Sequence, residues 1–201
     1  MDIQQALKNI IKPIYQQLRQ VFPGLYYFLQ YSRASSQMGN LAKERDELFN
    51  KLIAESTTKK CLQIGVKEDI GAKFGSNWVS VDQFDMRDFI DFHYDIHDLK
   101  FVDSEFDIVV CISILEHIPY PEKALKELYR VLKPGGEIWV QLPFHFPYHE
   151  APKDYWRASP DGLRIWMKDF QEIRCGSFLC TQTSLITSTF FYGAKTEAFG
   201  R

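Results

Sequence analysis

Short apolar runs alternate with amphipathic stretches from residue 60 onward. Four of these runs have the length of strands, at residues 61–64, 78–81, 106–111 and 137–142. Their near-continuous apolarity is typical of strands that are covered on both faces of a sheet. Because such strands alternate here with helical patterns, the chain predicts an α/β fold built on a parallel sheet.

The clearest helix is predicted for residues 121–132. Pro121 suits the first turn of a helix, and the Lys-Pro-Gly-Gly sequence at 133–136 ends it. The apolar residues between them fall on one stripe: Ala124, Leu125, Leu128, Val131 and Leu132. This segment is therefore expected to cover one face of the sheet.

A second amphipathic stretch, at residues 160–169, precedes two further apolar runs at 170–178 and 185–194. Only a few polar residues separate these two runs. Strands joined so tightly are antiparallel, so the pattern predicts a hairpin at one edge of the sheet.

The first 56 residues differ in composition and hydrophobic pattern from the rest. They predict an N-terminal helical cap or appendage, with the main domain at 57–201. Helical stripes occupy residues 3–14 and 41–53, and a Pro-Gly turn signal interrupts the aromatic segment 21–29. The apolar side of these helices needs a cover. We expect packing on the domain in preference to a membrane surface, with a homodimer through these helices as a further possibility.

Composition and charge narrow the classes of function. Of 201 residues, 45% are hydrophobic and 25% charged, and 24 basic against 26 acidic side chains give a net charge of −2. Without a basic field, nucleic acid is not an expected partner. The four cysteines form no Cys-x-x-Cys pair and no apolar run is long enough to span a membrane, so we expect a reduced, cytoplasmic chain without a metal site.

Candidate chemistry begins where the strands end, because ligands of open parallel sheets bind beyond the carboxyl ends of the strands. Gly65 follows the first run, and Asp82 follows the second, 17 residues later. This spacing favours a nucleoside-containing cofactor whose ribose hydroxyls bind the acid. The alternative, a turn at Gly65 and a loop cap at Asp82, is equally compatible with these two residues. A further cluster, Asp95, His97 and Asp98, either binds an exocyclic amine such as that of adenine or is a solvated loop.

Three segments carry a family resemblance: Phe-Asp-Ile-Val-Val at 106–110, Ile-Leu-Glu-His-Ile at 114–118, and the stretch from Leu125 to the Lys-Pro-Gly-Gly at 133–136. Together they resemble the class I S-adenosylmethionine-dependent methyltransferases, in a small-molecule or glycan branch similar to methyltransferase type 11. The resemblance covers about residues 58–197. It implies a Rossmann-like, seven-stranded, mostly parallel sheet with an antiparallel edge hairpin, and S-adenosylmethionine as the cofactor, with S-adenosylhomocysteine as the product.

The resemblance also implies roles for individual positions. Gln63, Gly65 and Val66 correspond to the turn beneath the methionine part of the cofactor, and Asp82 with Gln83 to the ribose site. The adenine site corresponds to Asp95 and Ile96. The floor of the cofactor pocket corresponds to Cys111, Ile112 and Ser113.

The turn after the first strand departs from the family pattern. The family has Asp or Glu before Ile-Gly, followed by Gly-x-Gly, whereas this chain reads Gln-Ile-Gly-Val-Lys-Glu-Asp at 63–69. A Gln does not supply the charge that attracts the ammonium and sulfonium groups of the cofactor. The alternative function is therefore a catalytically inactive, methyltransferase-like binding or scaffold protein.

The loop at 143–157, after the predicted strand at 137–142, is dense in His, Tyr, Trp and Arg and is the candidate acceptor site. It is similar to a Pro-x-Asp-Tyr-Trp-Arg segment of methyltransferase-like proteins associated with glycan and natural-product gene clusters. The predicted substrate-binding residues are His145, His149, Asp154, Tyr155, Trp156 and Arg157. A structural alternative has the two aromatics filling core space and Arg157 paired with Asp154.

The sequence therefore predicts a biosynthetic O- or N-methyltransferase acting on a small-molecule, natural-product or glycan-type acceptor. A hydroxyl acceptor needs a base, for which His145 or His149 comes first and His117 next, with Tyr155 as an orienting hydroxyl. An NAD-dependent dehydrogenase is excluded because the chain lacks Gly-x-Gly-x-x-Gly and predicts an edge hairpin.

Overall fold

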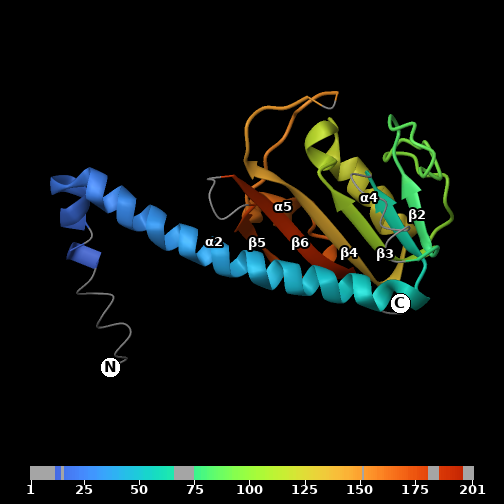
Figure 1. The fold of residues 1–201 in the computed structure, drawn as a ribbon, viewed down its shortest axis with the longest axis horizontal. Coiled ribbons are helices and arrows are strands. Elements are labelled where there is room, and N and C mark those ends of the chain that lie inside the picture. The colour runs from blue at the N-terminus through green and yellow to red at the C-terminus, as the bar shows by residue number, and fades with distance from the viewer. Residues whose placement is uncertain (1–11, 15, 66–74, 151, 181–185, 197–201) are drawn as a thin grey trace. The chain divides into compact units, whose positions relative to one another are not determined.

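A six-stranded sheet is the frame of the main unit (Figure 1). The computed structural model describes residues 12–14, 16–65, 75–150, 152–180 and 186–196. The strands are β1 (Cys61–Ile64), β2 (Trp78–Val81), β3 (Phe106–Ile112), β4 (Leu132–His145), β5 (Phe170–Leu179) and β6 (Thr187–Lys195), in the order β2-β1-β3-β4-β6-β5. The pairs from β2 to β4 are parallel, and β6 is antiparallel to both β4 and β5. The predicted α/β class and the antiparallel edge pair are confirmed.

The resemblance implied seven strands, and the described residues form six. Residues 91–94 make one bridge, between Val81 and Phe92, and add no further strand to the sheet. The side chain of Asp91 explains the early end of the pairing. Its Oδ2 accepts hydrogen bonds from both the amide and the hydroxyl of Ser80, at 2.8 Å each, so the Ser80 amide is taken before a longer ladder forms.

Two helices cover one face of the sheet, α4 (Pro121–Val131) and α5 (Pro160–Trp166). The apolar stripe predicted for α4 is buried against the strands, with Leu128 and Val131 fully covered. The predicted helix is thus confirmed to within one residue. Strand β4 follows α4 without a break and is longer than the predicted run at 137–142. Gly135, with a φ of 74°, lies where its pairing with β3 shifts register, between Leu132 and Glu137.

Helix α2 (Pro23–Ala54) contains the predicted helix at 41–53. The Pro-Gly pair at 23–24, predicted as a turn, begins this helix instead. Proline loses nothing at the first helical position, since the amide it lacks has no partner in the helix there. Most of the predicted stripe at 3–14 lies outside the described residues.

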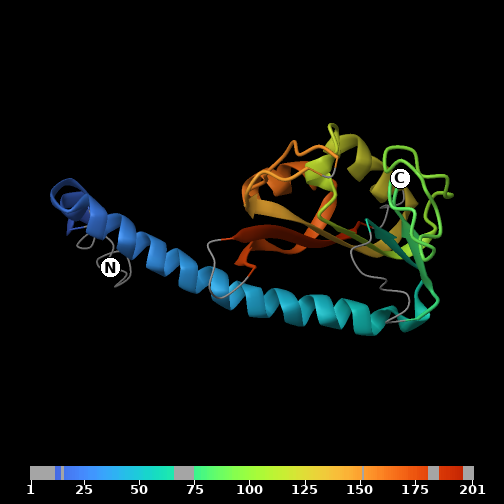
Figure 2. The same ribbon diagram turned by 45° about the horizontal axis from the view of Figure 1, so that its top comes forward.

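The chain divides into two units, residues 1–40 and 41–201. Within the second unit, the last turns of α2 lie along the face of the sheet opposite α4 and α5 (Figure 2). Leu52 and Ile53 are buried there with Trp139 and Phe190. Gly176 of β5 admits the helix closely, because a Cβ at this position would lie 2.3 Å from Cδ2 of Leu41.

Arg130 of α4 fastens the long loop between β2 and β3. Its guanidinium donates to the carbonyls of Leu99 and Phe101, at 2.8 Å each, and to Asp103 at 2.9 Å. Glu127, one turn earlier on α4, orients that guanidinium and also accepts from the Leu99 amide at 3.1 Å. Two side chains of α4 therefore hold the loop against the helix.

No helix within the described ranges combines the length and apolarity needed to span a membrane.

Candidate functional site

A cavity of about 630 Å³ opens at the carboxyl ends of β1 and β2. Its wall combines the ends of these strands with the loop after β2 and the short helix η2 (Leu115–His117). The lining residues are Ile64, Gly65, Val81, Asp82, Gln83, Phe84, Asp85, Tyr94, Ile96, Ile114, His117, Ile118 and Pro152. The cavity thus lies where the sequence placed the cofactor, and its wall is mainly apolar with two carboxylates.

Gly65 ends β1 in the left-handed region, with a φ of 71°. Its amide donates to the carbonyl of Val81 at 2.9 Å, so the turn starts from an intact pairing of β1 with β2. A Cβ at Gly65 would lie 2.0 Å from Cδ1 of Ile114. The missing side chain therefore leaves room for Ile114, which forms part of the cavity wall.

Asp82 lines the cavity and also caps the turn that follows β2. Its Oδ1 accepts hydrogen bonds from the amides of Phe84, at 2.9 Å, and Asp85, at 3.0 Å. The two roles weighed for this residue are thus compatible, because the cap uses one of the two carboxylate oxygens. Gln83 lies beside it on the cavity wall. The hydrogen bonds from the Arg87 side chain lower the pKa of the second carboxylate, Asp85.

The two residues predicted for the adenine site, Asp95 and Ile96, lie in different surroundings. Ile96 is buried and lines the cavity, whereas Asp95 is exposed and is not among the lining residues. Oδ1 of Asp95 accepts from the amide of His97 at 2.9 Å and pairs with its Nδ1 at 2.7 Å. Partial burial works in the opposite direction, but these bonds from His97 lower the pKa of Asp95. Asp95 thus caps its own loop.

Four other predicted cofactor positions are not among the described residues that line the cavity. Cys111 is in the core on the side of α4, where burial raises the pKa of its thiol, and Ile112 packs toward the opposite face. Ser113 is exposed, with a φ of 56°, and Gln63 is buried within β1. Val66 lies outside the described residues.

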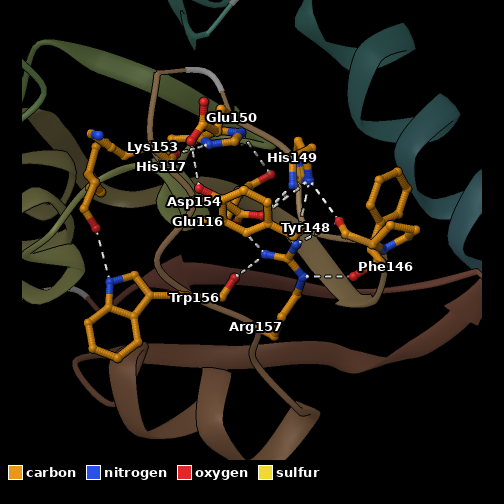
Figure 3. A network of polar contacts seen from close by, with 12 residues as sticks. Glu116, His117, Phe146, Tyr148, His149, Glu150, Lys153, Asp154, Trp156 and Arg157 are labelled. Carbon is orange, nitrogen blue, oxygen red and sulfur yellow. Dashed lines mark hydrogen bonds and ion pairs between the residues drawn. The ribbon is translucent and has the colours of Figure 1, made fainter.

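The loop after β4 is hydrogen-bonded to η2 and its flanks (Figure 3). The amide of Tyr155 donates to the carbonyl of Glu116 at 2.7 Å, and Nδ1 of His117 donates to the carbonyl of Lys153 at 2.5 Å. The indole of Trp156 donates to the carbonyl of Ile118 at 3.0 Å. These bonds join the predicted acceptor loop to the cavity wall that contains His117.

Asp154 and Arg157 form a paired anchor within this loop. The guanidinium meets the carboxylate through two bonds, of 2.5 and 2.7 Å, which lower the pKa of Asp154. Asp154 also accepts from the amide of His149 at 2.8 Å, and its side chain is only 2% exposed. This pair matches the structural alternative given for Arg157. Tyr155 and Trp156 are not core residues, since they are 49% and 39% exposed.

The predicted catalytic residues do not come together as one group. His117 lines the cavity, and its ring lies 4.9 Å from the ring of His149, at an interplanar angle of 89°. His145 and Tyr155 are absent from the cavity wall. His145 ends β4 in an exposed position, where its amide donates to Oγ1 of Thr187 at 3.1 Å.

Glu116 is a polar residue of the site that the sequence analysis did not select. Its side chain is fully buried, and burial raises the pKa of its carboxyl group to about 8. Neither carboxyl oxygen has a hydrogen-bond partner among the described residues, and Oε1 lies 3.7 Å from Nε2 of His117. In the sequence, Glu116 appeared only as part of the family motif at 114–118, and that motif gave no reason to select Glu116 as a site residue.

Comparison with known proteins agrees with this architecture. Residues 71–140 match the family model described as a methyltransferase domain. A ubiquinone biosynthesis O-methyltransferase of Pseudomonas putida is 43% identical over 52 residues, which are 26% of this chain and 20% of the relative. A tRNA U34 carboxymethyltransferase of Campylobacter curvus is 29% identical over 92 residues, 38% of this chain and 31% of the relative.

Among solved structures, a 1,6-didemethyltoxoflavin-N1-methyltransferase of Burkholderia thailandensis, bound to S-adenosylhomocysteine, has a TM-score of 0.57 at 14% identity. The alignment covers 87% of this chain and 91% of that one. The chain spans about a fifth of the length of the first curated relatives it matches. Residues 71–140 thus match a methyltransferase domain, and the chain shares the fold of solved methyltransferase structures.

Proposed function

We propose that the chain is a methyltransferase that takes its methyl group from S-adenosylmethionine and gives it to an oxygen or nitrogen of a small-molecule, natural-product or glycan-type acceptor. The observation that carries this proposal is the cavity at the ends of β1 and β2, with Asp82 and Ile96 in its wall. Nucleotide ligands of open α/β sheets bind at this position.

The residues of the cavity fit the nucleoside part of the cofactor. Its volume of about 630 Å³ falls in the range of roughly 300–1,000 Å³ that is usual for small-molecule and cofactor sites. Ile96 and Val81 supply apolar surface for a flat ring, and Asp82 supplies a carboxylate oxygen beyond the one that caps its turn. The residues proposed to hold the cofactor are Gly65, Asp82, Gln83 and Ile96.

The acceptor is proposed to bind beside His117. Of the four predicted catalytic residues, this one lies in the cavity wall. Its Nδ1 donates to the Lys153 carbonyl, so Nε2 of the neutral ring carries a lone pair that can accept a proton from a hydroxyl. His149 lies next to it and Arg157 fixes the loop, so both are proposed to shape the acceptor site.

The cofactor, when bound, supplies a methyl group activated by the sulfonium charge. A bound S-adenosylmethionine would give up its methyl group and leave as S-adenosylhomocysteine, and Nε2 of His117 would take the proton of a hydroxyl acceptor. For such a displacement the protein mainly has to align the reacting atoms and keep water away from them. An amine acceptor that binds unprotonated needs no base.

The acceptor class is proposed from charge as well as from the loop. A net charge of −2 and the absence of a basic run on the predicted acceptor loop favour a small acceptor over a nucleic acid. A panel of phenols, hydroxylated sugars and amines, assayed for release of S-adenosylhomocysteine, tests this part. Methylation of tRNA with no turnover on any member of the panel would contradict it.

Titration calorimetry with S-adenosylhomocysteine tests the cofactor site. We expect one site per chain, and we expect Asp82→Asn to weaken it at least about tenfold, since a hydrogen bond to a charged group contributes about 1.5–3 kcal/mol. Asparagine keeps an oxygen that can accept from the Phe84 and Asp85 amides, so the turn stays capped. Asp82→Ala removes both roles and should also lower the thermal midpoint.

Asp88→Ala is the matched control, because Asp88 is an exposed acid of the same loop outside the cavity wall. Its affinity should equal that of the parent chain. Absence of heat with both S-adenosylmethionine and its product would contradict the proposal. It would favour the second candidate, an inactive binding or scaffold protein, which is motivated by Gln63 in place of the usual acid.

A further inference from the structure

We propose that Glu116, His117 and His149 form a binding site for a divalent transition-metal ion of the zinc type, at the edge of the cavity. Each residue offers one ligand atom, and the three atoms lie within 4.8 Å of one another. One carboxylate and two imidazoles are a ligand set that zinc uses with a fourth position left open. The three side chains can be followed in Figure 3.

Both imidazoles present a lone pair on the same ring atom. Nδ1 of His117 donates to the carbonyl of Lys153, and Nδ1 of His149 lies 3.2 Å from the carbonyl of Pro147. A carbonyl can only accept, so Nδ1 of His117 carries the proton and its Nε2 can coordinate. For His149 the 3.2 Å contact with Pro147 favours the same assignment over the longer, 3.5 Å contact with Nη2 of Arg157. Histidines that bind metals are oriented in this way, by donating the other ring N–H to a backbone carbonyl or a carboxylate.

Glu116 supplies the independent observation. Its side chain is fully buried, and neither oxygen has a hydrogen-bond partner among the described residues. A buried carboxyl group without a hydrogen-bond partner is destabilising, and more so when it is charged. A cation beside Oε1 would satisfy this group, which lies 3.7 Å from Nε2 of His117.

Spacing and charge are compatible with an ion. Ligand atoms of a tetrahedral zinc site are about 3.3 Å apart for bonds of about 2.0–2.1 Å, so the 3.7 Å pair needs only a small approach. The guanidinium of the nearby Arg157 bonds to Asp154 and makes no hydrogen bond to Glu116. His149, with a side chain 34% exposed, gives access from solvent.

The position suggests a use for the ion, and this part alone rests on the proposed function. His117 belongs to the cavity wall, so an ion on its Nε2 would lie next to the acceptor. A bound divalent cation lowers the pKa of a hydroxyl that contacts it. The ion would then help to remove the proton of the acceptor hydroxyl, in place of the lone pair of His117.

Calorimetry with zinc chloride on the chelator-treated, tag-free full chain tests the site. We expect one ion per chain, and a loss of affinity of at least about tenfold for His149→Ala, which changes a half-buried loop residue and should leave the fold intact. Glu116→Gln should weaken binding similarly. Cobalt as a probe should give the intense visible absorption of a tetrahedral site, and this absorption should be lost in His149→Ala.

His145→Ala is the matched control for metal binding, since His145 is an exposed histidine at the end of β4 and belongs to no ligand group among the described residues. Its zinc affinity should be unchanged. Absence of zinc binding to the parent chain would overturn the inference, and so would tight binding that survives both His149→Ala and His117→Ala. Heat with S-adenosylhomocysteine on the same sample separates this failure from failure of the proposed function.

Discussion

Gly65 combines two requirements in one residue at the end of β1. Its φ of 71° is a conformation that side chains disfavour, and the space where a Cβ would lie is occupied by Ile114. The sequence analysis placed Gly65 in the turn beneath the methionine part of the cofactor. The structure adds a reason within the protein itself, because Ile114 reaches the cavity wall only past a residue without a side chain.

Replacing Gly65 by alanine should therefore destabilise the chain. A left-handed conformation costs about 1–2 kcal/mol for a residue with a side chain, and forcing atoms into a filled space costs typically about 1–3 kcal/mol more. We expect urea unfolding to show a loss of at least about 2 kcal/mol. The double variant with Ile114→Ala should recover the packing part, so the two effects should not be additive.

Gly39→Ala is the control, since a Cβ there meets nothing within 4 Å inside α2. Alanine favours helix over glycine, so this variant should be as stable as the parent chain or more stable. Equal losses for both variants would show that the geometry at Gly65 is not the cause.

Single positions also show how far the sequence could predict the site. Gly65 and Asp82, which line the cavity, could be predicted because they directly follow the apolar runs that form β1 and β2, whereas Ile96 came from the family resemblance. Glu116 and Ile114 were not predicted, since their orientation depends on how η2 leaves β3 and on the left-handed Ser113 before it. Such contacts depend on tertiary structure and leave no period or spacing in the sequence.

Among the elements, α2 shows that one helix can serve different surroundings along its length. Leu52 and Ile53 are buried against Trp139 and Phe190, whereas Leu25 is half exposed. The predicted period at 41–53 matches the buried part. The start of the helix was predicted wrongly because a Pro-Gly pair is equally suited to a turn and to a first helical turn.

Leu52→Ala should lower the free energy of unfolding by about 2–5 kcal/mol, the usual range for a fully buried leucine. Leu25→Ala, at an exposed position of the same helix, should change it by no more than about 0.5 kcal/mol. Urea titrations followed by far-ultraviolet circular dichroism measure both. A small effect at Leu52 would mean that the end of α2 does not stabilise the sheet.

At the scale of the whole chain, residues 1–40 and 41–201 form separate units. Described residues of the first unit expose large apolar side chains, among them Ile14, Val21 and Phe22. Exposed apolar surface of this kind commonly marks an interaction site. We retain the homodimer through the N-terminal helices as a proposal.

Removing residues 1–40 tests this proposal. The shortened chain should keep a cooperative thermal transition, because the sheet and the buried turns of α2 all belong to residues 41–201. Sedimentation equilibrium should give a dimer for the full chain and a monomer for the shortened one. A full chain that is already monomeric at high concentration would contradict the proposal, and a shortened chain that does not fold would contradict the division into units.

The hydrogen bonds from Arg130 and Glu127 to the loop between β2 and β3 affect the entropy of ligand binding. The wall that includes Ile96 is immobilised when the protein folds, so little conformational entropy remains to be lost when a small molecule docks there. Helix α4 thereby contributes to ligand affinity without contacting the ligand.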